Sequence, residues 1–384
     1  MTRHQEIQGQ TRSIKFALVV AFSGLLSQPV YPCTIFVLTD TNRVLFCNNE
    51  DWSNTKTRIW FVPGEAKRYG CVFVGFDDGF AQGGMNTEGL ASDWVAGYNV
   101  TWKPDPNLPT SVGNRQLLET CATVEEAITF LREHREMGFY TAKILVADRT
   151  GASAILGASN GKLKVEKSNQ CRGFGYGSPT LDALNLPSST PTVAKGTEIL
   201  RACLQKGKYA TKYSNIFDLK SGDIFLFPFP DRDDELKFNL KAELKKGGHY
   251  YDMPEIHEQL AQAPRPLLAS MKRSSLDNYQ PIPDKEPQVT AHVRAIWQDI
   301  LDDTMRAEDY TSESWKEMST NRKLGQATIK ALGPLVSLTL LERSEEKGRR
   351  SYRYRVEFAN NTLLQHFVFD EQNKIISCPA EDIK

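Results

Sequence analysis

Residues 32–38 of this 384-residue chain read Pro-Cys-Thr-Ile-Phe-Val-Leu, and residues 48–52 read Asn-Asn-Glu-Asp-Trp. The first stretch is a β-branched and apolar run, which is typical of a buried strand. A turn signal at residues 40–42 separates it from an apolar run over residues 44–47, so a hairpin is predicted. The sequence before Cys33 is of another kind, and Cys33 therefore stands at the junction between a leader and the first strand.

Residues 1–32 are similar to a secretory signal. Arg12 and Lys15 precede an uncharged apolar run over residues 16–26, which is too short to span a bilayer. No later stretch is long and apolar enough for a membrane helix, so we expect an exported protein, periplasmic or extracellular, without stable membrane insertion. Pro32 is not the small residue that signal peptidase prefers before its cut, nor the one expected before a lipid-bearing cysteine. We predict an earlier cut, followed by self-cleavage that makes Cys33 the first residue.

A cysteine at the start of a mature chain carries a thiol and a free α-amino group on one residue. The α-amine titrates near ~8, so it can take the thiol proton and return it. Asp51 follows the strand that returns from the hairpin, and it is expected beside the start of the partner strand, within reach of the amine. These residues predict an N-terminal-cysteine amidohydrolase, with Cys33 as nucleophile and its own amine as base.

Composition and charge argue against several other classes of protein. The chain has 47 basic and 47 acidic residues and no basic field that would suggest nucleic acid. Its six histidines show no zinc-ligand spacing, and the acidic run at 231–235 lacks the spacing of a calcium loop. We therefore predict no metal and no cofactor. Seven cysteines leave at least one unpaired in an exported chain, and the sequence does not assign pairs.

The secondary-structure pattern divides the chain into two parts. Helices are predicted from the capping box at 123–126 and over 193–204, between two sets of antiparallel strands, which indicates packed sheets with helices outside. Strands are predicted at 58–62, 71–76, 90–95, 142–147, 152–156, 162–165, 215–219 and 223–227. Residues 33–272 are therefore assigned to the catalytic domain and 273–288 to a linker. Residues 289–384 are predicted to form an α+β module with a structural or partner-binding role.

Three motifs resemble the choloylglycine hydrolase / penicillin V acylase family of linear-amide hydrolases. They are Cys33-Thr34-x-Phe36-Val37, Asn49-x-Asp51-Trp52 and the block Gly-Met-Asn-Thr-Glu-Gly-Leu at residues 84–90. Wider relatives of this family include acid-ceramidase-like amidases and isopenicillin N acyltransferase, and the resemblance extends over about residues 33–230. It implies an α+β fold, the four-layer αββα sandwich of N-terminal-nucleophile hydrolases. It also implies cleavage of a non-peptide linear carbon–nitrogen amide bond through an acyl-thioester on Cys33, with Asp51 orienting the amine.

Two positions depart from the family pattern. Asn48 stands where the family commonly has Arg, whose charge and forked donors an Asn does not supply. Gly177 stands where the family has an Asn that polarises the scissile carbonyl, and Asn169 is a candidate stand-in, with a turn residue as the alternative. Ala96, from its motif spacing, offers a backbone N–H to the oxyanion. Asn86 is expected to be a structural turn residue.

Aromatic residues are plentiful around the predicted site. They favour an apolar acyl group, although aromatic residues in strands belong more often to the core; they are Phe36, Trp52, Trp60, Phe61 and Trp94. Of these, Trp52 is predicted to contact substrate, together with Asn48 and Ala96. A small-molecule acyl amide is expected, and N-acyl amino acids, acyl lactones, penicillins, bile-salt conjugates and peptidic amides all stay open. The alternatives are an acyltransferase on the same scaffold and a non-catalytic envelope binding protein or lipoprotein. An oligomer is also left open.

Overall fold

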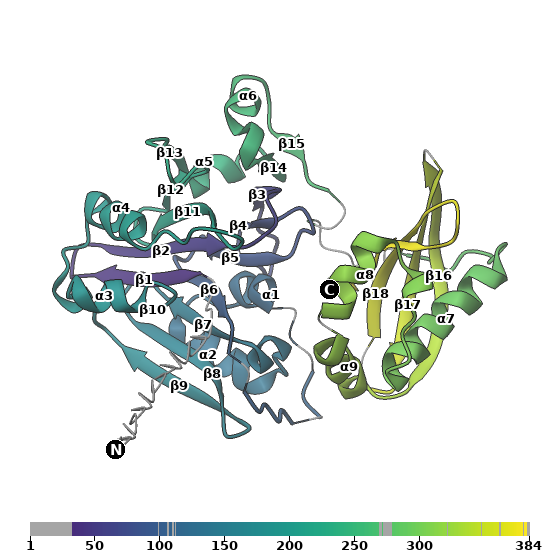
Figure 1. Ribbon diagram of the computed structural model, residues 1–384. Coiled ribbons are helices and arrows are strands. Elements are labelled where there is room, and N and C mark those ends of the chain that lie inside the picture. Colours follow the sequence, from purple (N-terminus) through teal and green to yellow (C-terminus); the bar gives the residue numbers. More distant parts are fainter. Residues whose placement is uncertain are drawn as a thin grey trace, which may run out of the picture.

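The computed structural model describes residues 33–381, except residues 99, 106, 110, 112, 269–270, 272–278, 321, 347, 361 and 379. The predicted leader and a part of the predicted linker lie outside the described residues. Figure 1 shows a larger body formed by the first part of the chain and a smaller one formed by the last part. No helix in the described ranges is long and apolar enough to cross a membrane.

Six antiparallel strands form the first sheet, in the order β10-β1-β2-β11-β12-β13. Their bounds are β1 (Thr34–Thr39), β2 (Val44–Asp51), β10 (Arg172–Gly175), β11 (Thr211–Asp218), β12 (Asp223–Phe227) and β13 (Leu236–Asn239). The predicted hairpin is confirmed, with Thr34 opposite Asn49. Strand β2 continues to Asp51, beyond its predicted end. This extension places Asp51 beside the start of β1.

Nine strands form the second sheet, in the order β15-β14-β3-β4-β5-β6-β7-β8-β9. Their bounds are β3 (Thr57–Val62), β4 (Cys71–Phe76), β5 (Ala81–Asn86), β6 (Ala91–Ala96), β7 (Ala142–Ala147), β8 (Ser153–Ser159), β9 (Lys162–Ser168), β14 (His249–Asp252) and β15 (Arg265–Pro266). Strand β5 was not predicted, because its adjacent glycines lower strand propensity. Gly83 is needed there, since a Cβ at this position would overlap the carboxylate of Asp93 on β6.

The two sheets pack face to face, and helices cover both outer faces (Figure 1). Side chains of both sheets, such as Phe46 and Val74, share one core between them. Helices α1 and α2 pack on the second sheet, and α3 and α4 pack on the first. Their bounds are α1 (Gly113–Thr120), α2 (Val124–Glu133), α3 (Ser178–Ala183) and α4 (Val193–Ala202), and two short helices follow, α5 (Leu240–Leu244) and α6 (Ile256–Ala261). The four-layer αββα sandwich is confirmed.

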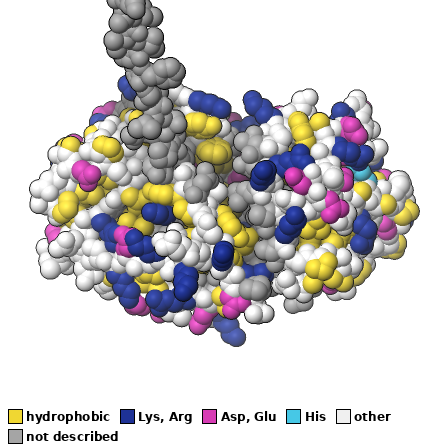
Figure 2. Space-filling model, turned by 60° about the horizontal axis from the view of Figure 1, so that its bottom comes forward, with side chains coloured by type: hydrophobic (Ala, Val, Ile, Leu, Met, Phe, Trp, Pro, Cys, Tyr) yellow, Lys and Arg dark blue, Asp and Glu magenta, His cyan; other side chains and the backbone are white. Residues whose placement is uncertain are grey.

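The C-terminal module has a core of its own, built from helices packed on a third, five-stranded antiparallel sheet. Its helices are α7 (Pro287–Asp302), α8 (Ser312–Thr320) and α9 (Arg322–Ala331), and its strands are β16 (Leu335–Glu346), β17 (Arg349–Phe358), β18 (Thr362–Phe369), β19 (Ile375–Ser377) and β20 (Ala380–Glu381). The predicted α+β organisation is confirmed, and α8 is an addition to it. Figure 2 shows one face of the molecule, on which Lys and Arg side chains are interspersed with acidic and hydrophobic ones.

Candidate active site

Cys33 lies directly before β1 and is buried, with 5% of its surface exposed. Its thiol is not in a disulfide. The side chain belongs to the core between the two sheets, together with Ile35 and Val37 on the same face of β1. The backbone φ of Cys33 is 69°, in the left-handed region that residues with a Cβ rarely adopt. The thiol therefore lies inside the sandwich, at a residue whose backbone is strained.

Asp51 holds the backbone nitrogen of Cys33. The Cys33 N–H donates to Oδ2 of Asp51 at 2.9 Å, and Thr211 on β11 donates its hydroxyl to Oδ1 at 2.5 Å. Burial raises the pKa of Asp51 to about 7, although these two hydrogen bonds and the charge of Lys212 act in the opposite direction. The predicted placement of Asp51 beside the start of β1 is therefore confirmed.

Glu50 is a site residue that the sequence analysis did not single out. Its Oε1 lies 3.5 Å from the Cys33 sulfur, and its Oε2 accepts from Asn48 Nδ2 at 3.3 Å and from the Tyr213 hydroxyl at 3.5 Å. Burial raises the pKa of Glu50 to about 8. Side chains alternate along a strand, so Asn48 and Glu50 point between the sheets while Asn49 faces α4. The sequence did contain a signal for this: Asn48 and Glu50 follow the apolar Phe46 at every second position, so they share its buried face of the strand.

Asp93 brings a third carboxyl group to the same region from the second sheet. Its neighbours Ala91 and Val95 on the same face of β6 belong to the core between the sheets, so Asp93 faces the first sheet. It is fully buried, and its Oδ1 accepts from the Trp94 N–H at 2.7 Å. Burial, followed by the charge of Glu50, raises the pKa of Asp93 well above its usual range.

Several buried polar atoms in this region have no hydrogen-bond partner within the described part of the chain. They are Oδ2 of Asp93, Oδ1 of Asn48 and both side-chain amide atoms of Asn215, which lies opposite Asn48 in the pairing of β2 with β11. Buried polar groups are normally satisfied, so such a group of orphaned atoms is consistent with a binding surface for water or ligand. Burial, followed by the charges of Glu50 and Asp51, raises the pKa of the Cys33 thiol well above its usual value.

The structure does not bring Asn169 to the site, and this prediction is corrected. Asn169 is an exposed bend residue between β9 and β10. Strand β10 runs antiparallel to β1, with Gly175 opposite Thr34 and Arg172 opposite Val37, so Asn169 lies beyond the end of β1 that is remote from Cys33. The turn-residue alternative therefore holds.

The segment that follows β10 lies against Cys33 instead. The Tyr176 N–H donates to the Cys33 carbonyl oxygen at 2.8 Å, and the Gly177 N–H donates to the Thr34 hydroxyl at 2.9 Å. A Cβ at Gly177 would approach the Cys203 sulfur at 2.6 Å. This close approach gives a structural reason for Gly177 at a position where the family has Asn.

Ala96 and Trp52 lie at the edges of the site region. Ala96 ends β6, three residues after Asp93, and its side chain packs on the core beneath the helices. The role of its N–H in oxyanion stabilisation stays a prediction. Trp52 follows β2, is 42% exposed, and has its ring 6.0 Å from the ring of Tyr209. The other aromatic residues considered are buried in the core; they are Phe36, Trp60, Phe61 and Trp94.

Asn86 is a structural residue, as expected. Its side-chain amide donates to the carbonyl oxygens of Leu118 and Cys121, and its Oδ1 accepts from the N–H groups of Glu88 and Leu90. Two of these bonds close the turn after β5, and the other two tie it to α1 and to the residue that follows α1. Across the described residues, no group of three or more His, Cys, Asp or Glu side chains is arranged to hold a metal ion.

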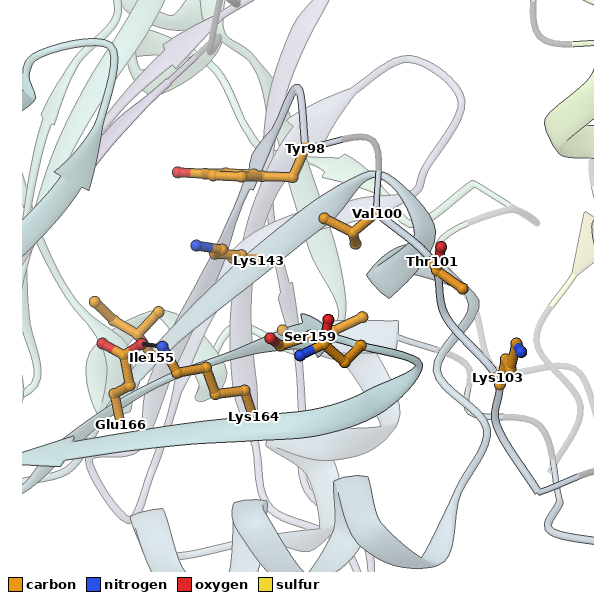
Figure 3. A pocket seen from close by; sticks show the side chains of 12 residues that line it. Tyr98, Val100, Thr101, Lys103, Lys143, Ile155, Ser159, Lys164 and Glu166 are labelled. Carbon is orange, nitrogen blue, oxygen red and sulfur yellow. Dashed lines mark ion pairs between the residues drawn. The ribbon is translucent and has the colours of Figure 1, made fainter.

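An open cavity of about 500 Å³ is present elsewhere on the domain, and neither Cys33 nor its carboxyl neighbours line it. Figure 3 shows the ring of Tyr98 above Lys143, with 4.4 Å between the ammonium nitrogen and the ring centroid, and the ion pair of Lys164 with Glu166. The cavity is formed by β7, β8, β9 and the segment around residues 98–103. It has a polar, lysine-rich lining but holds none of the reactive groups described above.

Part of the chain matches a known protein family. Residues 39–173 match the family model described as acyl-coenzyme A:6-aminopenicillanic acid acyl-transferase. The matched segment begins after Cys33 and contains Glu50, Asp51 and Asp93. For this segment, the match agrees with the resemblance drawn from the motifs, whose wider relatives include an acyltransferase of penicillin chemistry.

The structure is also similar to solved structures over part of its length. Penicillin V acylase from Agrobacterium tumefaciens aligns with 18% identity and a TM-score of 0.44, covering 54% of this chain and 86% of that one. Two variants of conjugated bile acid hydrolase from Clostridium perfringens align with 15% identity and a TM-score of 0.46, covering 57% of this chain and 95% and 96% of theirs. No curated protein sequence matches at a significant level.

Proposed function

We propose that this chain is an N-terminal-nucleophile enzyme that cleaves a linear carbon–nitrogen amide bond through an acyl-thioester on Cys33. The observation that carries the proposal is the 2.9 Å hydrogen bond from the Cys33 nitrogen to Asp51. That contact joins a buried thiol, its own backbone nitrogen and a carboxylate, and these are the parts that an N-terminal cysteine nucleophile needs. The family match over residues 39–173 supports the same class of chemistry.

Removal of the leader is part of the proposal. While Pro32 is attached, the Cys33 nitrogen is a planar amide, which is essentially non-basic. Cleavage turns it into an amine that titrates near ~8, with Asp51 in position to pair with its ammonium form. The left-handed backbone at Cys33 costs on the order of 1–3 kcal/mol. Because φ is defined by the bond to residue 32, cleavage removes that constraint, so strain favours the processed chain.

The proposed reaction then follows from the arrangement of the groups. The Cys33 sulfur attacks the scissile carbonyl, the amine leaves, and an acyl-thioester remains until water attacks it. Acyl transfer to an acceptor amine is the second candidate function, and the match to an acyl-transferase model is the observation that favours it. The site supports both outcomes, since they differ only in the group that accepts the acyl chain.

Labelling with a thiol-directed acylating probe tests the proposed nucleophile. We expect an adduct on the peptide that begins with Cys33, its loss in Cys33→Ala, and its retention in Cys171→Ala, a control that changes another buried cysteine. If correctly processed protein formed no adduct at Cys33, the binding-protein alternative would move ahead of the enzyme.

Product analysis separates hydrolysis from transfer and defines the substrate. A panel of N-acyl amino acids, acyl lactones, penicillins, bile-salt conjugates and peptidic amides is scored by released amine, with and without added acceptor amines. Free acid as the main product in the presence of acceptor amine would indicate a hydrolase, and a new amide would indicate a transferase. Cleavage of α-peptide bonds alone would contradict the linear-amide assignment.

Export and the position of the mature terminus belong to the same proposal. We expect mass spectrometry of the exported protein to show Cys33 as the first residue, and Cys33→Ala to keep residues ahead of position 33. Active protein that still carried Pro32, or a lipid on Cys33, would contradict the proposed mechanism.

A further inference from the structure

The Cys33 sulfur has two polar contacts among the described residues. These are Oε1 of Glu50 at 3.5 Å and the carbonyl oxygen of Asp51 at 4.0 Å. Only the carboxyl group of Glu50 can accept a proton and release it again at ordinary pH. Glu50 is therefore the side chain in direct contact with the reacting atom, whereas Asp51 contacts the backbone nitrogen.

Neighbouring side chains fix the orientation of the Glu50 carboxyl group. Asn48 Nδ2 and the Tyr213 hydroxyl both donate to Oε2, at 3.3 and 3.5 Å. Oε1 is left to face the sulfur. Glu50 is 4% exposed, so bulk water does not compete for it.

The α-amine of Cys33 cannot serve as the base for its own thiol in every stage. Before the leader is removed it does not exist, because the nitrogen is an amide, yet self-cleavage already requires an activated thiol. After removal, the hydrogen bond to Asp51 holds the nitrogen at the Asp51 carboxyl group, whereas Oε1 of Glu50 already lies beside the sulfur. A second base is therefore needed for self-cleavage, and the same carboxyl group stays in contact with the thiol afterwards.

We infer that Glu50 is a catalytic acid–base residue that carries the proton of the Cys33 thiol, an inference that rests on the proposed function. As the sulfur bonds to the acyl carbon, its proton passes to Oε1 of Glu50. The carbon–nitrogen bond then breaks, and the leaving nitrogen takes that proton. In the second half, water or an acceptor amine gives a proton to Glu50 as it bonds to the acyl carbon. The sulfur–carbon bond breaks, and the thiolate takes the proton back.

The same steps describe removal of the leader. There the acyl carbon is the carbonyl of Pro32, and the leaving nitrogen is that of Cys33 itself. Proton transfer from the thiol to an ionised Glu50 leaves the total charge of the pair unchanged. Because no new net charge is created in the buried site, the transfer avoids much of the desolvation cost of ionising a thiol there.

The groups that face Glu50 set the pH at which it can act. They are Cys33, Tyr213 on β11 and Asp93 on β6, and Asp51, the next residue on β2, acts on Glu50 through its charge. Burial raises the pKa of Glu50 to about 8, and the charge of Asp51 adds to the rise. This brings the proton affinity of the carboxyl closer to that of a thiol, which improves proton exchange between them. Acylation of Cys33 is therefore expected to rise with pH through about 8.

The test measures single-turnover acylation of processed, full-length protein across pH, with two substrates that share one acyl group. A p-nitrophenyl ester has a leaving group that needs no proton, whereas an anilide has one that does. We expect Glu50→Gln to slow acylation by the ester about 10²-fold, and by the anilide still more, since both proton transfers are lost. The rise near pH 8 should also disappear. A purely structural effect would slow both substrates equally.

Two further variants complete the design. Glu136→Gln, at another buried carboxyl group with a raised pKa, should leave both rates unchanged. Tyr213→Phe removes a hydrogen bond that lowers the pKa of Glu50, so the rise of acylation should move to higher pH. The latter experiment stands even if Glu50→Gln does not fold.

Failure of this inference differs from failure of the proposed function. If wild-type protein is not acylated at Cys33, the proposed function fails. If wild type is acylated, and Glu50→Gln reacts at the same rate with the same pH profile, the amine is the base and the role of Glu50 is overturned. A Tyr213→Phe profile that superimposes on that of wild type would count against Glu50 as well.

Discussion

The region around Cys33 and the cavity beside Tyr98 differ in both charge and exposure. The first is buried, with the carboxyl groups of Glu50 and Asp93 between the two sheets and that of Asp51 at the Cys33 nitrogen. The second is an open volume of about 500 Å³ whose lining includes three lysines, at 103, 143 and 164. The open cavity carries no group with a strongly perturbed pKa in contact with a nucleophile. The reactive groups, rather than the volume, locate the chemistry here.

The two regions are nevertheless connected through the core. The ring of Tyr98 lies 6.4 Å from that of Phe174, and Phe174 is opposite Ile35, two residues after Cys33. Substitutions in the two regions therefore affect the same domain, and their effects on the acylation of Cys33 can be compared directly. The predictions below make that comparison, from the largest expected effect to the smallest.

Replacement of Cys33 is expected to have the largest effect. Cys33→Ala removes the sulfur that forms the acyl bond, so turnover should fall by about 10⁴-fold or more and processing should stop. Steady-state amide hydrolysis and intact mass measure the two effects. The variant should remain folded, because alanine at this buried position removes only one sulfur atom from the core. Residual processing in Cys33→Ala would mean that another protease exposes position 33.

Replacement of Asp51 should come next in size. Asp51→Asn keeps the shape of the side chain but removes the negative charge that holds the Cys33 ammonium group, and we expect a loss of about 10²-fold in kcat/KM. Thr211→Val removes only one hydrogen bond to Asp51 and should cost less. Kinetics on processed protein measure both. If the two variants lost activity equally, the negative charge of Asp51 would not be the property by which Asp51 supports activity.

The acidic region should also make the unprocessed chain less stable at high pH. Glu50 and Asp51 have folded-state pKa values raised to about 8 and about 7, from ordinary values of 4.5 and 3.8. The folded state therefore binds more protons than the unfolded state between about pH 4 and pH 8, so stability is highest below this range and falls as pH rises through it. For unprocessed Cys33→Ala we therefore expect stability to fall by several kcal/mol between pH 5 and pH 8.

Urea denaturation at the two pH values measures this loss. Adding Glu50→Gln to Cys33→Ala should flatten the dependence, because the amide does not titrate. A stability that rose with pH over this interval would contradict the burial of these carboxyl groups as acids. In the processed chain the ammonium of Cys33 pairs with Asp51, so its loss of stability with pH should be smaller.

The hairpin that carries the site could be predicted from sequence, but its full set of groups could not. Strong β propensity and a clear turn define β1 and β2, and they place Asp51 near Cys33. Glu50 lies one residue before Asp51. Its role depends on its side chain pointing from β2 into the core between the two sheets. A single sequence does not show that a charged residue in a strand points into a core, since most such residues point to solvent.

Contacts between distant strands were also beyond the sequence. Asp93 belongs to the other sheet, where its carboxylate lies over Gly83 of the neighbouring strand. Only the packing of the two sheets brings it near Glu50. Asn169 was assigned to the site as a stand-in for the Asn that Gly177 replaces, and strand β10 was not predicted. Once the antiparallel pairing of β10 with β1 is known, the bend that contains Asn169 must lie at the other end of β1.

The smallest effect is expected in the lysine-rich cavity. Lys143→Met keeps the length of the side chain and its apolar stem over Tyr98 but removes the charge, and it changes no group that contacts Cys33, Glu50 or Asp51. If the chemistry resides between the sheets, single-turnover acylation by a neutral ester should change by less than about threefold, because a partly exposed charge outside the site is screened by solvent. The matched measurement is the Glu50→Gln rate with the same ester. A decrease of the acylation rate in Lys143→Met as large as that in Glu50→Gln would mean that the cavity and the buried thiol act as one site. The two regions would then not be functionally distinct.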